Sequence, residues 1–233
     1  MITEALIAGA CGGLLWLDRF QIFQVMVSRP IVSGPLVGWI VGDLNAGLAS
    51  GLLFELLWLR RPPVGGFISP DVTLASIANS AVSASVRTET GAELLSIVFL
   101  SFVTLLPIAF LGTKLDILLR TLVGKIAHAA EKVQFSGGER AVIPYFAAAL
   151  GLGFSLAFLF LVPIILFGTF FLAHLVPLIP PIVMRALGTA FFVVPLLGII
   201  DLLVGLEHTR HTILFLVGFL AALGGSFILG LLG

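Results

Sequence analysis

The segment from Pro30 to Leu59, PIVSGPLVGWIVGDLNAGLASGLLFELLWL, contains two apolar runs that are short for membrane-spanning helices. The runs, Pro30 to Asp43 and Leu44 to Leu59, each have roughly 14 to 16 residues and reach only ~21–24 Å, whereas a hydrocarbon core is about 30 Å thick. Short apolar segments interrupted by Gly and Pro are typical of re-entrant hairpins, because non-helical backbone at membrane depth requires surrounding protein or a water-filled cavity. The segment therefore predicts a broken or re-entrant hairpin, and Asp71 to Val86 is a third short run.

The composition of the whole chain points to a protein embedded in lipid. Hydrophobic residues make up 59% of the 233 residues, charged residues only 10%, and the mean hydropathy is +1.20. Soluble domains carry roughly 25% charged residues, so lipid must cover much of this surface. The formal net charge of +0 argues against a nucleic-acid partner. No polar linker divides the chain, and we expect a single membrane domain over residues 1–233.

The C-terminal half contains apolar segments that are long enough to cross a membrane. We predict an all-α integral membrane protein, a polytopic helical bundle with broken or re-entrant hairpins in residues 1–90 and spanning helices in residues 141–233. About five to seven elements cross or re-enter the membrane. The stretch from Ala141 to Val176 holds either one long span or a pair broken at Pro163. The other long apolar segments are Ala92–Leu111, Ile182–Val204 and Ile213–Leu232.

A polar segment, Lys114 to Arg140, separates the two halves. Its apolar residues recur at helical spacing, and five Lys and Arg residues occupy the remaining positions: Lys114, Arg120, Lys125, Lys132 and Arg140. An amphipathic, cationic segment between spans is expected at the cytoplasmic surface. It is either an interfacial linker or a docking surface for a soluble partner.

The sequence contains no catalytic motif. HExxH, Gly-x-Ser-x-Gly and Walker A patterns are absent, and the four histidines lack the spacing of a metal site. We therefore expect no catalytic residues, no bound metal and no cofactor.

Ionisable residues inside apolar runs are the better candidates for function. A charge at bilayer depth costs roughly 2.5–3.5 kcal/mol, so Glu55, in the run GLLFELLW, requires a partner. It either takes part in ligand binding or forms a structural salt bridge. Asp43 and Asp71 stand at expected helix starts, where a carboxylate either caps the helix or binds a ligand. Glycines 34, 38 and 42, and then 47 and 51, recur every four residues, which favours close helix packing over close approach to a ligand.

The motifs in residues 18–80 resemble those of a known transporter family. In order they are DRFQ from Asp18, SRPIVSGPLVG from Ser28, Gly42-Asp43, GLASGLLFELLWL from Gly47, and VGGFISPD from Val64 to Asp71. They are similar to the motifs of the IIC component of the mannose/fructose/sorbose phosphotransferase family, with the same order and spacing.

The resemblance implies a multi-pass subunit of the bacterial inner membrane that transports a sugar and is not itself an enzyme. It implies a second membrane subunit, IID, in an oligomeric complex, and soluble IIA and IIB subunits that carry the phosphoryl group on histidines. It also implies an elevator-type shift of a core built from the broken hairpins. The substrate-binding residues we expect are Glu55, Asp71, Asp43, Ser69 and Arg29, because carboxylates are strong acceptors for sugar hydroxyls.

Two positions depart from the family pattern. Pro63 stands where the family commonly has Asn, and Arg60 where it has Gly. Pro63 has no amide side chain to bind a hydroxyl. The substrate is therefore unusual, or the chain is a degenerate homologue with a regulatory or scaffolding role; a membrane enzyme or an unrelated carrier is a third hypothesis.

Overall fold

The computed structural model describes residues 1–58, 68–137 and 139–204. Residues Arg60 and Pro63 and the predicted span Ile213–Leu232 lie outside this part. In the described residues the chain forms eight α-helices and two short 3₁₀ helices. The protein is an all-helical integral membrane protein, as the sequence predicts.

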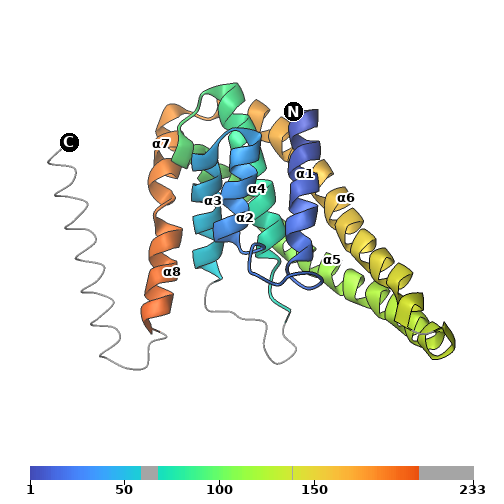
Figure 1. Ribbon diagram of the computed structural model, residues 1–233. Helices are drawn as coiled ribbons and strands as arrows, with labels where there is room; N and C mark the ends of the chain where they lie inside the picture. The colour runs from blue at the N-terminus through green and yellow to red at the C-terminus, as the bar shows by residue number, and fades with distance from the viewer. Residues whose placement is uncertain (59–67, 138, 205–233) are drawn as a thin grey trace, which may run out of the picture.

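The N-terminal half is a bundle of four short helices. They are α1 (Ile2–Leu17), α2 (Pro30–Val41), α3 (Leu44–Leu57) and α4 (Val72–Thr90). The four helices stand side by side, and successive helices run in opposite directions (Figure 1). Helix α2 stops at Gly42, whose left-handed φ of 105° suits a residue without a Cβ. The predicted boundaries of the short runs are thus confirmed to within a few residues.

Glycines let α2 and α3 touch backbone to backbone. A Cβ placed on Gly47 would lie 2.5 Å from the carbonyl oxygen of Gly34, and one placed on Gly38 would lie 2.6 Å from the Cα of Gly47. The packing interpretation of the glycine spacing is therefore confirmed for these three positions. Gly42 differs from them, because a Cβ there would meet nothing and the turn conformation is what requires glycine.

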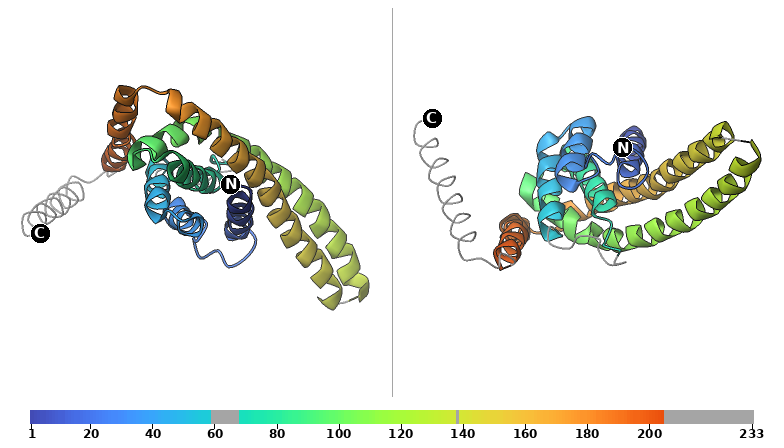
Figure 2. Two further views of the ribbon diagram at one scale, coloured as in Figure 1. Left: turned by 90° about the horizontal axis from the view of Figure 1, so that it is seen from above. Right: turned by 60° about the horizontal axis from the view of Figure 1, so that its bottom comes forward.

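Helix α4 occupies the centre of the bundle. Every residue from Thr73 to Val86 is buried, and the helix contacts α1, α2, α3, α5 and α6. Seen from above, it lies among these helices (Figure 2). Because its sequence is rich in the small residues Ala and Ser, the helix is narrow and several neighbours can pack around it.

The predicted span Ala92–Leu111 and the predicted segment Lys114–Arg140 form one continuous helix, α5 (Leu94–Gly137). At 1.5 Å per residue it is about 66 Å long, well beyond the thickness of a bilayer. The composition changes near Lys114, but the apolar stripe continues through Leu115, Leu119 and Val123 and packs on α6. The expectation of two separate elements was wrong because a change in polarity does not end a helix.

Helix α6 (Ile143–Leu175) follows a 3₁₀ turn (Glu139–Val142) and returns along α5. The C-terminal part of α5, from about Lys114, and the N-terminal part of α6 form an arm that leaves the bundle (Figures 1 and 2). Pro163 lies inside α6 without dividing it, so the stretch from Ala141 to Val176 follows the single-helix alternative.

The predicted span Ile182–Val204 is divided into α7 (Pro181–Ala190) and α8 (Val193–Val204), after a second 3₁₀ turn (Val176–Leu178). Pro195 explains why the helix is divided. Its ring clashes with the carbonyl of Phe191, four residues earlier, and proline has no amide hydrogen to donate to that carbonyl.

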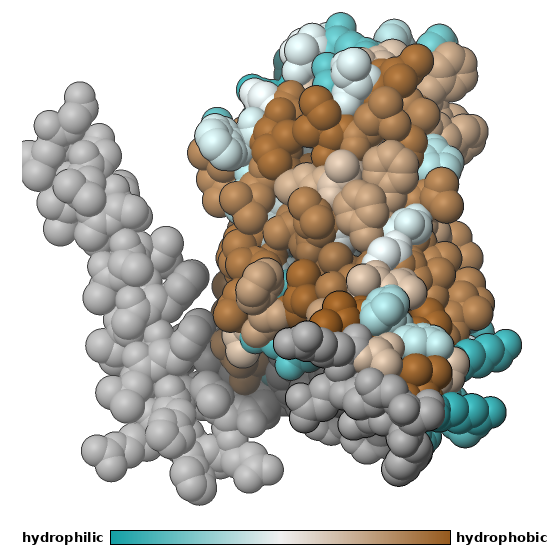
Figure 3. Space-filling view, turned by 45° about the vertical axis from the view of Figure 1, so that its right-hand side comes forward, coloured by the Kyte–Doolittle hydropathy of each residue, from teal (hydrophilic) through white to brown (hydrophobic). Residues whose placement is uncertain are grey.

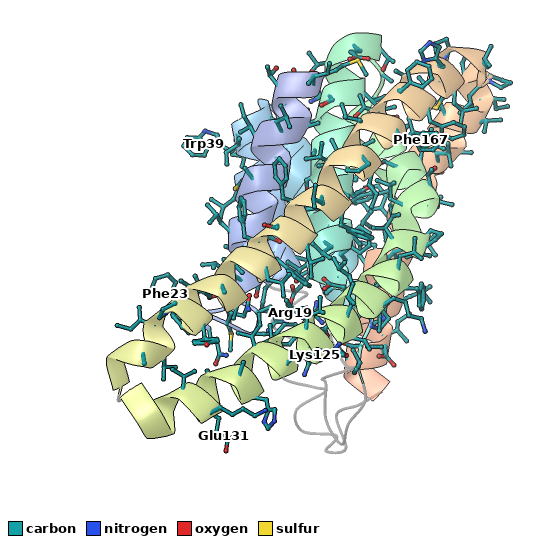
Figure 4. All side chains as sticks on the ribbon, turned by 90° about the vertical axis from the view of Figure 1, so that its right-hand side faces the viewer. Arg19, Phe23, Trp39, Lys125, Glu131 and Phe167 are labelled. Atoms are coloured by element: carbon teal, nitrogen blue, oxygen red, sulfur yellow. The ribbon has the colours of Figure 1, made fainter. Side chains whose placement is uncertain are left out.

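The surface has the distribution expected of a chain in lipid. Three helical stretches of the described residues are long and apolar enough to cross a membrane: Leu94–Val133, Ile143–Leu178 and Pro181–Leu202. A broad hydrophobic band covers the visible face, with hydrophilic residues gathered toward its two ends (Figure 3). Trp39 and Phe167 lie on the outside of this band, 68% and 70% exposed (Figure 4).

Candidate functional site

A cavity of about 180 Å³ lies at the end of the bundle where α1 and α3 finish and α2 and α4 begin. It is smaller than the roughly 300–1,000 Å³ typical of pockets for drug-sized ligands, so it suits a small molecule. Three of the five predicted site residues, Arg29, Glu55 and Ser69, line it. The polar and aromatic side chains in its wall are Arg19, Ser28, Arg29, Phe54, Glu55, Trp58, Ser69 and Thr73.

The partner that Glu55 requires is Arg29, the residue just before α2. The Arg29 guanidinium donates to Oε1 of Glu55, and the backbone amide of Ile31 lies 3.4 Å from Oε2. The carboxylate thus faces the start of α2, where helix amides favour negative charge. Because Glu55 is paired and also lines the cavity, the structural and ligand-binding hypotheses are compatible.

Asp71 caps α4 and lies behind the cavity wall. Its Oδ1 accepts from the backbone amide of Leu74 at 3.0 Å, so the predicted cap is confirmed. Its Oδ2 accepts from Nε1 of Trp16 at 2.7 Å, and Nη1 of Arg19 lies 2.7 Å from Oδ1. The residue is fully buried. Helix α5 approaches so closely that a Cβ on Gly112 would lie 2.6 Å from Cβ of Asp71.

Asp43 lies at the opposite end of the bundle. It caps α3 through the amide of Ala46 at 3.0 Å, which confirms the predicted cap, and it pairs with Arg87. A separate cavity of about 470 Å³ borders it there, together with Asn45 and Gly91. The structure therefore does not bring Asp43 together with the other four predicted residues.

Five polar or aromatic residues of the cavity wall were not among the predicted site residues: Arg19, Ser28, Phe54, Trp58 and Thr73. Trp58 stacks on Phe54, with ring centroids 6.4 Å apart and planes 7° apart. Arg19 lies two residues after the end of the apolar helix α1, and a cation at the end of such an apolar run was a signal available in the sequence. Guanidinium donors, a carboxylate acceptor and a flat aromatic face together suit a polyol.

Asp18 holds the loop that brings Ser28 and Arg29 to the cavity. Its two oxygens accept from the amides of Val25 at 2.8 Å and Ser28 at 3.1 Å. Burial raises the pKa of this carboxyl, but the amide hydrogen bonds outweigh burial and leave the pKa below its ordinary value. Phe23, Gln24 and Met26 all have positive φ, between 54° and 68°. Such conformations are costly for these residues, and the Asp18 hydrogen bonds help to hold them.

A family model described as the sorbose-specific IIC component of the phosphotransferase system matches residues 2–231. The chain belongs to this family. The sorbose-specific EIIC component of Klebsiella pneumoniae is 30% identical over 208 residues, which cover 88% of this chain and 73% of the relative.

Two further IIC relatives match shorter stretches. The mannose-specific EIIC component of Escherichia coli (strain K12) is 29% identical over 126 residues, 54% of this chain and 42% of the relative. The fructose permease IIC component of Bacillus subtilis is 28% identical over 142 residues, 61% of this chain and 48% of the relative. The match therefore spans less than half the length of these two relatives.

Two solved structures have a fold similar to that of this chain. One, described only as a membrane protein, has a TM-score of 0.70 at 22% identity and covers 98% of this chain and 91% of its own. The other is a cryo-EM structure of the mannose transporter ManYZ with a microcin, with a TM-score of 0.55 at 23% identity over 95% of this chain and 85% of that one.

Proposed function

We propose that this chain is the sugar-translocating IIC subunit of a mannose/fructose/sorbose-type phosphotransferase system, and that the cavity at Glu55 binds the sugar. The observation that carries the proposal is the position of the cavity. Arg29, Glu55 and Ser69 belong to the motifs shared with the family, and three different segments of the chain bring them to one small cavity.

A sugar in this cavity would meet both kinds of hydrogen-bonding group. Arg29 donates, Glu55 accepts, and the hydroxyl of Ser69 does either. Trp58 offers an apolar face to the carbon–hydrogen face of a sugar ring. Since Arg29 balances the charge of Glu55, the cavity suits an uncharged ligand.

The distribution of cations supports an orientation in which the cavity faces the cytoplasm. At the cavity end and along the arm, the described residues include six cations: Arg19, Arg29, Lys114, Arg120, Lys125 and Lys132. The described cations of the opposite half are Arg87 and Arg185. Cytoplasmic segments carry the excess of Lys and Arg, so this end lies where a soluble phosphocarrier delivers its phosphoryl group.

The chain acts in a complex in the bacterial inner membrane. Its partners are a IID-type membrane subunit and soluble IIA and IIB phosphocarriers. The fold shared with ManYZ supports the membrane partner, and the cationic arm supports the soluble ones. The phosphoryl transfer belongs to these partners, because the chain itself has no catalytic motif.

Uptake of radiolabelled D-mannose, L-sorbose and D-fructose, in cells that contain the partner subunits with and without this chain, tests the proposal. We expect uptake of at least one sugar to depend on the chain. Sugar uptake could instead be equal in the two kinds of cell, although the chain is detected in the membrane of those that produce it. That result would support a degenerate homologue with a regulatory or scaffolding role.

A further inference from the structure

Arg19 reaches the cavity from the end of α1 and is held in one position. Its guanidinium lies 2.7 Å from Oδ1 of Asp71 and 5.0 Å from the centre of the Phe20 ring. The side chain is 15% exposed and forms part of the cavity wall. Figure 4 shows Arg19 between the bundle and the arm.

The side chain of Asp71 is not accessible to a ligand in the cavity. It is 0% exposed, and Leu74, Trp16 and Arg19 approach its two carboxylate oxygens. Asp71 itself does not line the cavity, whereas its ion-pair partner Arg19 does.

Arg19 has more N–H donors than its ion pair with Asp71 uses. A guanidinium carries five N–H groups in a rigid plane, and within the described part of the chain Asp71 is the one acid that pairs with this one. Nη1 lies 2.7 Å from Oδ1 of Asp71, and the other N–H groups of the guanidinium can donate to two neighbouring hydroxyls in a fork geometry that lysine does not offer.

We propose that Arg19 contacts the sugar directly, and that Asp71 and Trp16 are positioning residues that act through it. The proposal rests on the proposed function, because it requires a polyol in the cavity. It assigns to Arg19 the recognition of a pair of adjacent hydroxyls, beside the acceptor Glu55 and the apolar face of Trp58.

Equilibrium binding of radiolabelled D-mannose, L-sorbose and D-fructose to membranes that contain the full chain tests the assignment. We expect Arg19→Gln to weaken binding about tenfold to a hundredfold, since a hydrogen bond from a charged group is lost. Arg19→Lys should bind with intermediate affinity, because it keeps the charge and loses the fork.

The positioning role is tested by a double-mutant cycle. We expect Asp71→Asn to weaken binding, and the double variant Arg19→Gln/Asp71→Asn to bind no more weakly than Arg19→Gln, because Asp71 acts only through Arg19. Trp16→Phe is the second variant. It removes the indole N–H that donates to Oδ2 of Asp71 and leaves the helix cap through Oδ1 in place. It should weaken sugar binding less than Asp71→Asn does.

Arg120→Gln is the matched control. This arginine also lies over the Phe20 ring, at 4.4 Å, but it pairs with Asp116 on α5 and does not line the cavity. It should bind sugar with wild-type affinity.

Wild-type affinity in Arg19→Gln would overturn the contact, and strictly additive losses in the cycle would overturn the positioning role, while the proposed function stands in both cases. Failure of the wild-type chain to bind any of the three sugars would overturn the proposed function as well.

Discussion

Arg29, the last residue before α2, reaches across to α3 and binds the carboxylate of Glu55 at the edge of the cavity. The pair joins two motifs that lie 26 residues apart in the chain. Replacing Glu55 by Gln keeps the shape of the side chain, removes its charge and leaves Arg29 without a counter-ion. We expect sugar uptake to fall about tenfold or more while the amount of protein in the membrane stays nearly unchanged.

The control for this variant is Glu131→Gln, a carboxylate that is 64% exposed on the arm, and it should transport normally. Normal uptake by Glu55→Gln would identify Glu55 as a purely structural partner of Arg29.

The glycine contact between α2 and α3 predicts a stability defect. We expect Gly47→Ala to lower the free energy of unfolding by about 1–3 kcal/mol, because the added methyl group meets backbone that cannot move aside. Gly124→Ala on α5 is the matched control, since a Cβ there meets nothing within 4 Å. It should be neutral or stabilising by up to about 1 kcal/mol. Thermal unfolding in detergent, followed by circular dichroism, measures both.

The hydrogen bonds to Asp18 predict a pH dependence. The pKa of this carboxyl is lower in the folded chain than in the unfolded chain, so its contribution to stability is present above the unfolded pKa of about 3.9 and is lost as pH falls through the lower folded value. We expect Asp18→Asn to melt at a lower temperature than wild type at pH 7. The difference should narrow on acidification below about pH 4. A constant difference at every pH would contradict this assignment.

The orientation of the arm is tested by cysteine labelling. In a Cys11→Ser background, we expect Lys125→Cys to react with an impermeant maleimide only after the membrane is opened, because the arm is predicted to be cytoplasmic. Labelling from outside intact spheroplasts would reverse the orientation and place the cavity on the outer side.

Assembly is tested by purification. We expect affinity purification in mild detergent to recover a IID-type membrane protein with this chain. Transport of sugar by the chain alone in proteoliposomes would show that no membrane partner is needed.

Local patterns in the sequence determined much of the fold. The short helices α2, α3 and α4 follow from the positions of Pro30, Gly42 and Asp71, each of which starts or stops a helix through its own backbone chemistry. The continuity of α5 was missed because we interpreted the change in polarity near Lys114 as a boundary, although the apolar stripe through Leu115, Leu119 and Val123 continues past it.

The candidate site was predictable to a similar extent. An acid in an apolar run identified Glu55 and its need for a cation, but not that Arg29 supplies it. Asp43 was grouped with the other candidates because its motif lies between theirs in the sequence. In the structure, α2 runs along the bundle and places Asp43 at the opposite end. Arg19 belongs to a family motif but was not predicted as a site residue, because its ion pair with Asp71 joins positions 52 residues apart.

The close backbone contact of α2 with α3 also limits how the transporter moves. Packed side chains can change rotamer when two helices shift, but Gly34, Gly38 and Gly47 bring main chain against main chain, which has no such freedom. Sliding one of these helices along the other would drive Cα atoms into carbonyl groups. We therefore expect α2 and α3 to move as one unit, with the hinges of a conformational cycle in the loops that enter and leave the pair.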